Sequence, residues 1–222
     1  MSFLYCLNTS TIRNKNTSVM NAIDIAADAG YDGIEPWVEE IDKWVKGGGT
    51  LSDLQKKATD RGIQIVNLIA FFEWAVPEDD QRSKGLDEAR RCFEIADALD
   101  CSFVAAPPFG IQNREVDLFP VAQRYAELLD AIVGFQAKPL LEFWGIARTL
   151  GTLGEALLVA AECGCPGTLL LADVYHMYKG SGHFHGLEHL GTGKLGLVHV
   201  NDYPEQPGRD TVTDADRVYP GD

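Results

Sequence analysis

Apolar runs of strand length alternate along the chain with segments whose apolar residues recur every three to four positions. Runs with strand character lie at 3–7, 63–69, 101–106, 139–143, 168–172 and 195–200, and one further run ends at Glu35. Helical periodicity appears at 17–30, 50–61, 86–99, 118–137 and 152–163. A run that is apolar throughout predicts a strand buried on both faces. The alternation therefore predicts a parallel sheet covered by helices.

The repeat length of this pattern narrows the fold. Strand and helix alternate seven times at intervals of roughly 30 residues, which is typical of a (β/α)8 TIM barrel. After Asp202 the sequence is rich in Pro, Gly and charge, and it contains no eighth apolar run. We predict an α/β protein with a (β/α)8 TIM barrel fold from which the eighth strand–helix unit is missing. It is expected to form a single domain over residues 1–222, incomplete at its carboxyl end.

Composition excludes several classes of protein. Hydrophobic residues make up 45% of the chain, and the net charge of −14 gives a pI of about 4.7. An acidic surface repels phosphate backbones and anionic lipid, so we expect no nucleic-acid partner and no membrane partner. The amino terminus lacks the pattern of a signal peptide, and no apolar stretch approaches membrane-spanning length, so we predict a cytoplasmic protein. The five cysteines form no CxxC pair, which favours reduced, buried thiols.

Three potential metal ligands stand at the ends of successive predicted strands. Glu142, Asp173 and His199 are separated by 31 and 26 residues, about one strand–helix unit each. Because the strands of a parallel barrel present their carboxyl ends at one face, we expect these side chains to lie together. Two carboxylates and one imidazole suit a divalent ion such as Mn, Mg, Co or Zn.

Each of these residues also has a simpler interpretation. A single Glu at a strand end is usually solvated or paired with a cation, and a lone His is usually a satisfied hydrogen-bonding group. His176, three residues after Asp173, is a candidate ligand, a partner of a ligand or a donor to substrate, and we favour the last. The glycine-broken cluster of His183, His185 and His189 is typical of an exposed loop. The aromatic residues at 71, 72 and 74 suggest either the wall of a pocket or a cap on the sheet.

The segments GIEPW, PLLEFWG, LLLADVYHM, LVHVND and DRVYPGD occur in an order that resembles the xylose isomerase-like barrels. That family includes sugar isomerases and epimerases, inosose-processing enzymes and endonuclease IV. The resemblance covers nearly the whole chain. It implies a divalent metal held by Glu142, Asp173 and His199 together with a Glu on the eighth strand, which has no counterpart here. It also implies that His176 and Arg217 contact substrate.

The resemblance further implies a mechanism in which the metal chelates the carbonyl and a neighbouring hydroxyl of a sugar-like ketone. Glu142 then removes the proton α to the carbonyl, and the absent eighth-strand Glu would return a proton. Glu35, Trp37 and Trp144 are further candidate substrate-binding residues, and both tryptophans could equally be structural.

Three functions remain open from sequence. The first is a metal-dependent isomerase or epimerase of a sugar or polyol ketone acting through an enediolate. The second is a dehydratase of an inosose or dehydroshikimate-like substrate, and the third is a non-catalytic sugar-binding homologue. Endonuclease activity is disfavoured because Val218 stands where the nuclease branch needs a histidine. The exposed edges of an incomplete barrel predict homo-oligomers. The absent eighth-strand Glu predicts weaker metal binding and little isomerase activity from the 222-residue form.

Overall fold

The computed structural model describes residues 3–13 and 17–222, and the chain divides into two compact units. The first unit comprises residues 1–70, 88–105 and 134–138. The second comprises residues 71–87, 106–133 and 139–222. The expectation of a single domain over residues 1–222 stays a prediction.

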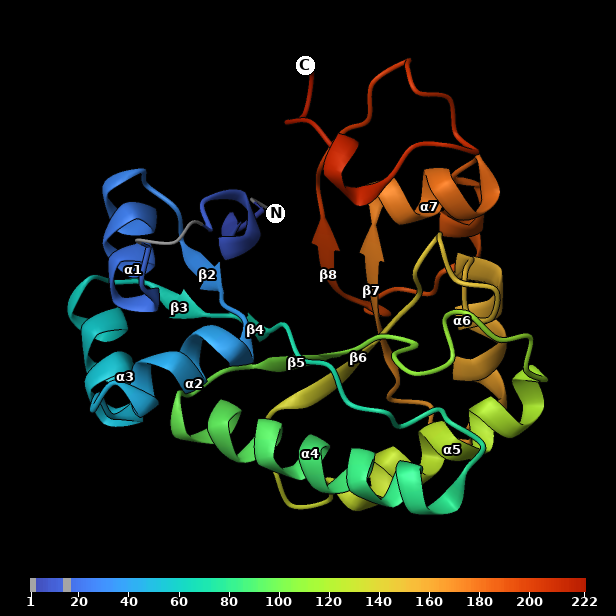
Figure 1. Cartoon of the computed structure of the whole chain (residues 1–222), viewed down its shortest axis with the longest axis horizontal. Helices are drawn as coiled ribbons and strands as arrows, with labels where there is room; N and C mark the ends of the chain where they lie inside the picture. Colours follow the sequence, from blue (N-terminus) through green and yellow to red (C-terminus); the bar gives the residue numbers. More distant parts are fainter. Residues whose placement is uncertain (1–2, 14–16) are drawn as a thin grey trace. The chain divides into compact units, whose positions relative to one another are not determined.

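The first unit contains short parallel strands and the helices between them (Figure 1). Its elements are β1 (Cys6–Asn8), η1 (Thr9–Thr11), α1 (Val19–Asp28), β2 (Gly33–Glu35), α2 (Val38–Lys46), α3 (Leu51–Asp60), β3 (Gln64–Ile65), β4 (Asn67–Leu68), the second half of α4 (Asp79–Ala98) and nearly all of β5 (Phe103–Ala106). Strand β2 pairs with β1 and β3, and β4 pairs with β5, all in parallel. The predicted parallel strands are therefore present.

The helix boundaries of this unit follow the sequence signals closely. Ser18 accepts a hydrogen bond from the amide of Asn21 and begins α1, and Thr50 begins α3 by accepting from Asp53. Gly30 and Gly62 follow these helices with φ of +81° and +70°, which only glycine adopts freely. These caps and stops explain why α1 and α3 were predictable to within a few residues.

Two features of this unit differ from the prediction. Helix α2 was not predicted, although Val38, Ile41, Trp44 and Val45 recur at helical spacing in its mostly charged sequence. The predicted third strand over 63–69 is divided, since β3 pairs with β2 whereas β4 pairs with β5. The break falls at Val66, so one barrel strand carries two labels.

The second unit carries the three strands that follow (Figure 1). Its elements are the first part of α4, α5 (Leu118–Ala131), most of β6 (Lys138–Glu142), α6 (Leu153–Glu162), β7 (Leu169–Asp173), α7 (Val174–Ser181), η2 (His185–His189), β8 (Leu195–His199) and η3 (Asp214–Asp216). Strand β7 lies between β6 and β8 and pairs with both in parallel. The labels β6, β7 and β8 correspond to the fifth, sixth and seventh predicted strands.

One edge of the three strands in the second unit remains open. In the described ranges β8 pairs with β7 alone, and Leu195, Val198 and Val200 are exposed along it. An unpaired apolar edge favours association with other chains, and the predicted homo-oligomer stays a prediction. No helix among residues 3–13 and 17–222 is long and apolar enough to cross a membrane.

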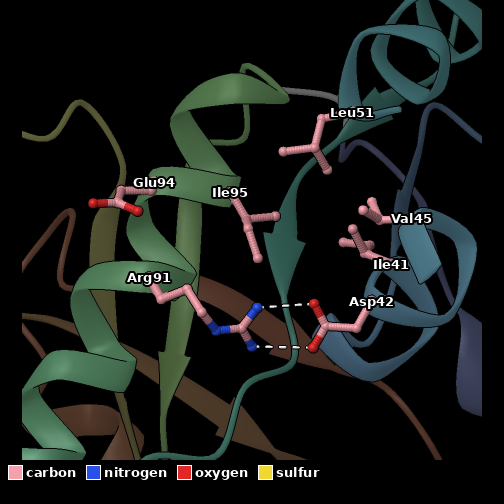
Figure 2. Close-up of a pocket in the computed structure, with 7 residues that line it drawn as sticks. All are labelled: Ile41, Asp42, Val45, Leu51, Arg91, Glu94 and Ile95. Carbon is pink, nitrogen blue, oxygen red and sulfur yellow. Dashed lines mark hydrogen bonds and ion pairs between the residues drawn. The ribbon is translucent and has the colours of Figure 1, made fainter. Parts of the chain in front are cut away.

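Helices α2 and α4 are linked within the first unit by a two-pronged ion pair (Figure 2). The Arg91 guanidinium donates to the two carboxylate oxygens of Asp42 at 2.8 and 3.1 Å, and it also pairs with Glu88. Around this pair, Ile41, Val45 and Ile95 line a shallow pocket of about 250 Å³. These side chains belong to the helices and not to the strand ends where ligands are expected.

We expect Arg91→Ala to lower the free energy of unfolding by about 1 kcal/mol, because bidentate geometry raises the value of a part-exposed ion pair above the usual range. That loss corresponds to a decrease in melting temperature of about 2 to 4 °C for a chain of this size. The matched control is Arg148→Ala, whose single contact with Glu115 is 4.0 Å long and largely exposed. Equal decreases in the two variants would show that the α2–α4 pair contributes nothing specific.

Candidate active site

The carboxyl ends of β6, β7 and β8 bring the predicted ligands into one region of the second unit. Asp173 is the last residue of β7, and its register partner is His199, the last residue of β8. Glu142 ends β6 and pairs in register with Leu171, two positions before Asp173. Asp173 is 1% exposed and Glu142 is 7% exposed. The sheet therefore holds two buried carboxylates and one imidazole at its carboxyl edge.

The Asp173 carboxylate is surrounded by donors. The Asn201 amide donates to Oδ1 at 3.0 Å and to Oδ2 at 3.1 Å, and the backbone amide of His176 donates to Oδ1 at 3.2 Å. His199 Nδ1 lies 3.3 Å from Oδ2, and Arg217 Nη1 lies 3.5 Å from the same oxygen. Burial would raise the pKa of Asp173, but the hydrogen bonds from His199 and the Asn201 amide hold it well below its ordinary value. Asp173 is therefore an anion at neutral pH.

His176 lies in the first turn of α7 and is 6% exposed. Burial lowers the pKa of its imidazole, and the opposing charge of Asp173 does not overcome this effect. Its Nδ1 accepts a hydrogen bond from the backbone amide of Gly145 at 3.2 Å. A neutral imidazole that accepts at Nδ1 carries its proton on Nε2, so His176 has one N–H left to donate.

The loop between β6 and α6 can lie this close to α7 only because residue 145 is a glycine. A Cβ on Gly145 would lie 2.4 Å from the carbonyl oxygen of His176 and 2.7 Å from the amide of Gly180. Any side chain there would push the loop away from His176. The glycine therefore helps to fix the tautomer of the imidazole.

The segment after β8 returns to the end of β7 and carries Arg217. The Tyr175 hydroxyl donates to the carbonyl oxygen of Val212, and the Arg217 guanidinium lies 5.4 Å from the centroid of the Tyr175 ring. Asp214 also accepts from Arg217 Nε through its backbone carbonyl at 3.2 Å. These contacts bring Arg217 from a loop far along the chain to the Asp173 carboxylate.

Three aromatic residues that follow successive strands form a cluster in the second unit. Phe71 and Phe109 stack with centroids 5.3 Å apart, and Phe71 meets Trp144 edge to face at 5.4 Å. Phe71 is 39% exposed, which suits a wall that can contact a ligand. Trp74, a wall candidate from sequence, is instead fully buried and donates to the carbonyl of Pro107. Its role is therefore structural.

Glu35 and Trp37, two further residues predicted to bind substrate, belong to the first unit. The Glu35 carboxylate accepts from the Asn8 amide at 2.7 Å and from the Asn67 amide at 2.6 Å. The Trp37 indole donates to Ser10 at 2.8 Å, and the Arg13 guanidinium lies 4.4 Å from its ring. Both residues therefore have partners inside their own unit, and their contact with substrate stays a prediction.

The donor chemistry at Asp173 and His199 fits a divalent cation. Two ligand atoms that each lie about 2.1 Å from one ion, at angles of about 90° to 109°, are about 3.0 to 3.4 Å apart. The 3.3 Å between Asp173 Oδ2 and His199 Nδ1 falls in that interval. No group of three or more His, Cys, Asp and Glu side chains is placed to hold a metal anywhere in residues 3–13 and 17–222. The structure therefore brings together two of the predicted ligands, and Glu142 as the third stays a prediction.

Sequence reasoning missed Asn201 and Gly145. Asn201 is two positions after His199, and residues two apart on a strand point to the same side. That spacing could have assigned the amide to Asp173. No sequence pattern pointed to Gly145. A side chain at this position would clash with the backbone of α7, which lies more than 30 residues later in the chain.

A family model described as the xylose isomerase-like TIM barrel matches residues 23–222. A 3-dehydroshikimate dehydratase of Pseudomonas putida is 22% identical over 188 residues, which are 82% of this chain and 28% of that protein. The chain thus spans little more than a quarter of the length of that curated relative.

Solved structures show the same fold. The IolI protein with a bound zinc atom superposes with a TM-score of 0.88 at 21% identity, over 99% of this chain and 80% of that chain. A D-psicose 3-epimerase studied in the presence of D-fructose gives a TM-score of 0.75 at 17% identity, over 92% and 76% of the two chains. At these identities the likeness establishes the TIM barrel fold. The predicted fold class is confirmed.

Proposed function

The chain belongs to the xylose isomerase-like TIM barrel family, and from this membership we propose that it is a divalent-metal-dependent isomerase or epimerase of a sugar or polyol ketone. The family includes epimerases, isomerases and dehydratases, all of which are enzymes. The observation that carries the proposal is the contact of Asp173 with His199 at the ends of two paired strands, with Glu142 ending the strand beside them.

In this proposal Glu142, Asp173 and His199 hold the cation, which is Mn, Mg, Co or Zn. When bound, it would stabilise negative charge that develops on the carbonyl oxygen of the substrate. The IolI structure contains zinc, which supports a divalent ion in this fold. Asp173 supplies a fixed negative charge, since its pKa is held low.

Proton transfer is assigned to Glu142. A buried carboxylate at a strand end is suited to remove the proton from the carbon α to the ketone, leaving an enediolate. Return of that proton by Glu142 to the other carbon gives an isomer. Delivery of a proton to the opposite face, which gives an epimer, requires a second acid on that face, such as the eighth-strand Glu of the family or a water molecule. Loss of a β-hydroxyl from the same enediolate gives the product of a dehydratase.

His176 is assigned to the developing oxyanion as a donor. Its imidazole is neutral and its Nδ1 is occupied by the Gly145 amide, so Nε2–H is a fixed hydrogen-bond donor and cannot act as a base. Arg217 and the aromatic residues Trp144, Phe71 and Phe109 are assigned to the hydroxyls and the apolar face of the substrate.

A dehydratase is the second candidate, and it is favoured by the match to the 3-dehydroshikimate dehydratase of Pseudomonas putida. The two candidates share the first proton removal and differ in the fate of the enediolate. Incubation of the chain with Mn²⁺ and a panel of ketoses, inososes and 3-dehydroshikimate separates them by the chromatographic retention and the mass of the product. An isomer or epimer has the mass of the substrate, whereas dehydration removes one water. No product from any substrate, with Mn²⁺ bound, would favour the sugar-binding homologue.

We expect His176→Ala to lower turnover by about a hundredfold, the usual effect of removing one oxyanion donor, while the affinity for Mn²⁺ changes by less than about threefold. The backbone amide that contacts Asp173 is kept in this variant. His189→Ala, an exposed residue in η2, is the control. Loss of Mn²⁺ from His176→Ala would make His176 a metal ligand instead.

A further inference from the structure

The Asp173 carboxylate already has a cationic partner in this structure, and that partner is Arg217. Arg217 Nη1 lies 3.5 Å from Asp173 Oδ2, the same oxygen that faces His199 Nδ1 at 3.3 Å. Asp173 is 1% exposed, and a buried carboxylate without a counter-charge is strongly destabilising. The guanidinium therefore adds to the hydrogen bonds from His199 and Asn201 in compensating a charge that solvent cannot screen.

The contact is looser than a structural ion pair in the same chain. Arg91 reaches the two oxygens of Asp42 at 2.8 and 3.1 Å in a two-pronged arrangement, whereas Arg217 touches one oxygen of Asp173 at 3.5 Å. The Arg217 side chain is also 33% exposed, so it borders solvent. A long, single-pronged contact at the solvent boundary is one that a stronger cation can replace.

Arg217 also has alternative partners that would hold it once it leaves Asp173. Its Nη2 lies 3.6 Å from Asp214 Oδ1, its Nε donates to the backbone carbonyl of Asp214 at 3.2 Å, and the Tyr175 ring lies beneath it. Arg217 makes these contacts at the same time as its contact with Asp173, so they remain to hold the guanidinium if it leaves Oδ2.

We infer that Arg217 is an exchangeable counter-ion of Asp173, which neutralises the carboxylate in the metal-free protein and withdraws from Oδ2 when a divalent cation binds there. This inference rests on the proposed cation site. The two positive groups exclude each other because both would lie within a few ångströms of one oxygen, where like charges repel strongly. Cation binding thereby releases the guanidinium toward the hydroxyl or carboxylate oxygens of a ligand. Arg217 thus couples loading of the cation to recognition of the ligand.

The first test measures the affinity for Mn²⁺ by calorimetry on the full chain, without substrate. We expect Arg217→Gln to bind Mn²⁺ about tenfold more tightly than the wild type, because the ion no longer has to displace a cation. Arg217→Lys keeps the charge and should give an intermediate affinity. The matched control is Arg209→Gln, which removes one positive charge from the same segment, where Arg209 pairs with the exposed Asp210. Its affinity should stay within about twofold of the wild type, since exposed charges are screened.

The second test uses metal-free protein and measures melting temperature. Arg217→Gln should lower it by about 3 to 6 °C, because Asp173 is left buried without its cation. In the Asp173→Asn background the same substitution should have little effect, since no charge remains to be neutralised. Adding Mn²⁺ should restore most of the stability of Arg217→Gln, because the ion replaces the lost counter-charge.

Equal Mn²⁺ affinities in the wild type, Arg217→Gln and Arg209→Gln would overturn the exchange while leaving the cation site intact. An equal increase in Mn²⁺ affinity in Arg217→Gln and Arg209→Gln would show that only the net charge matters, and it would also overturn the exchange. Absence of Mn²⁺ binding in all three proteins would reject the proposed cation site, and with it the exchange.

Discussion

Asp173→Asn is expected to lower the affinity for Mn²⁺ by about a hundredfold or more. The substitution removes the anionic ligand that pairs with His199 at 3.3 Å and replaces it with a neutral amide. Losses of 10- to 100-fold are typical even for groups that only support a ligand, so loss of a ligand itself should exceed them. Calorimetric titration of metal-free protein with Mn²⁺ gives the result directly.

Asparagine is the informative replacement because Asp173 also begins α7. Its side chain accepts the His176 amide at the start of that helix, and asparagine caps helices as well as aspartate does. The variant should therefore fold, and circular dichroism checks that it does. The control is Asp210→Asn, whose carboxylate is 90% exposed in the loop before η3. The same Mn²⁺ affinity in both variants would remove Asp173 from the cation site.

Glu142→Gln is expected to reduce proton exchange at the carbon α to the carbonyl by about a thousandfold. Glutamine has nearly the same shape but cannot accept the proton, and general-base contributions lie at about 10² to 10⁴. The measurement is the rate of deuterium incorporation from solvent, followed by NMR. Mn²⁺ affinity is measured alongside, because Glu142 is also assigned as a ligand.

Two comparisons make the Glu142 result interpretable. Glu162→Gln removes an exposed carboxylate at the end of α6 and should leave exchange unchanged. Deuterium exchange is measured at Mn²⁺ concentrations that saturate Glu142→Gln. A slower rate then reflects the loss of the base and not incomplete binding of the cation. Undiminished exchange in the saturated variant would show that another group removes the proton.

The strands that position the site could be predicted because each is apolar throughout and ends abruptly on a polar residue. The runs at 168–172 and 195–200 predicted β7 and β8, and the spacing of Asp173 and His199 predicted their contact. These contacts could be predicted from short segments alone, because the carboxyl ends of neighbouring parallel strands lie together regardless of the loops that connect them.

The parts that could not be predicted depend on long-range packing. Arg217 reaches Asp173 because the segment folds back, held by the Tyr175 hydroxyl on Val212 and by the bridge between Asp202 and Val218, and no spacing in the sequence encodes that return. From sequence Trp74 could line a pocket or fill the core, and only the fold shows that it packs against Tyr125 and donates its indole N–H to the carbonyl of Pro107. Helix α2 is a different case, because Val38, Ile41, Trp44 and Val45 recur at helical spacing and the helix could have been predicted from them.

The most direct test of the account is solvent exchange catalysed by the wild-type chain. The protein is loaded with Mn²⁺ in deuterated water and incubated with an inosose, with D-fructose and with 3-dehydroshikimate, and NMR follows the carbon α to each ketone. We expect deuterium at that carbon in at least one substrate, dependent on Mn²⁺ and lost in Asp173→Asn and Glu142→Gln. Removal of the proton requires only Glu142 and the cation, so this exchange is expected even where the absent eighth-strand Glu keeps turnover to product low. Stoichiometric Mn²⁺ binding without exchange in any of the three substrates would contradict it.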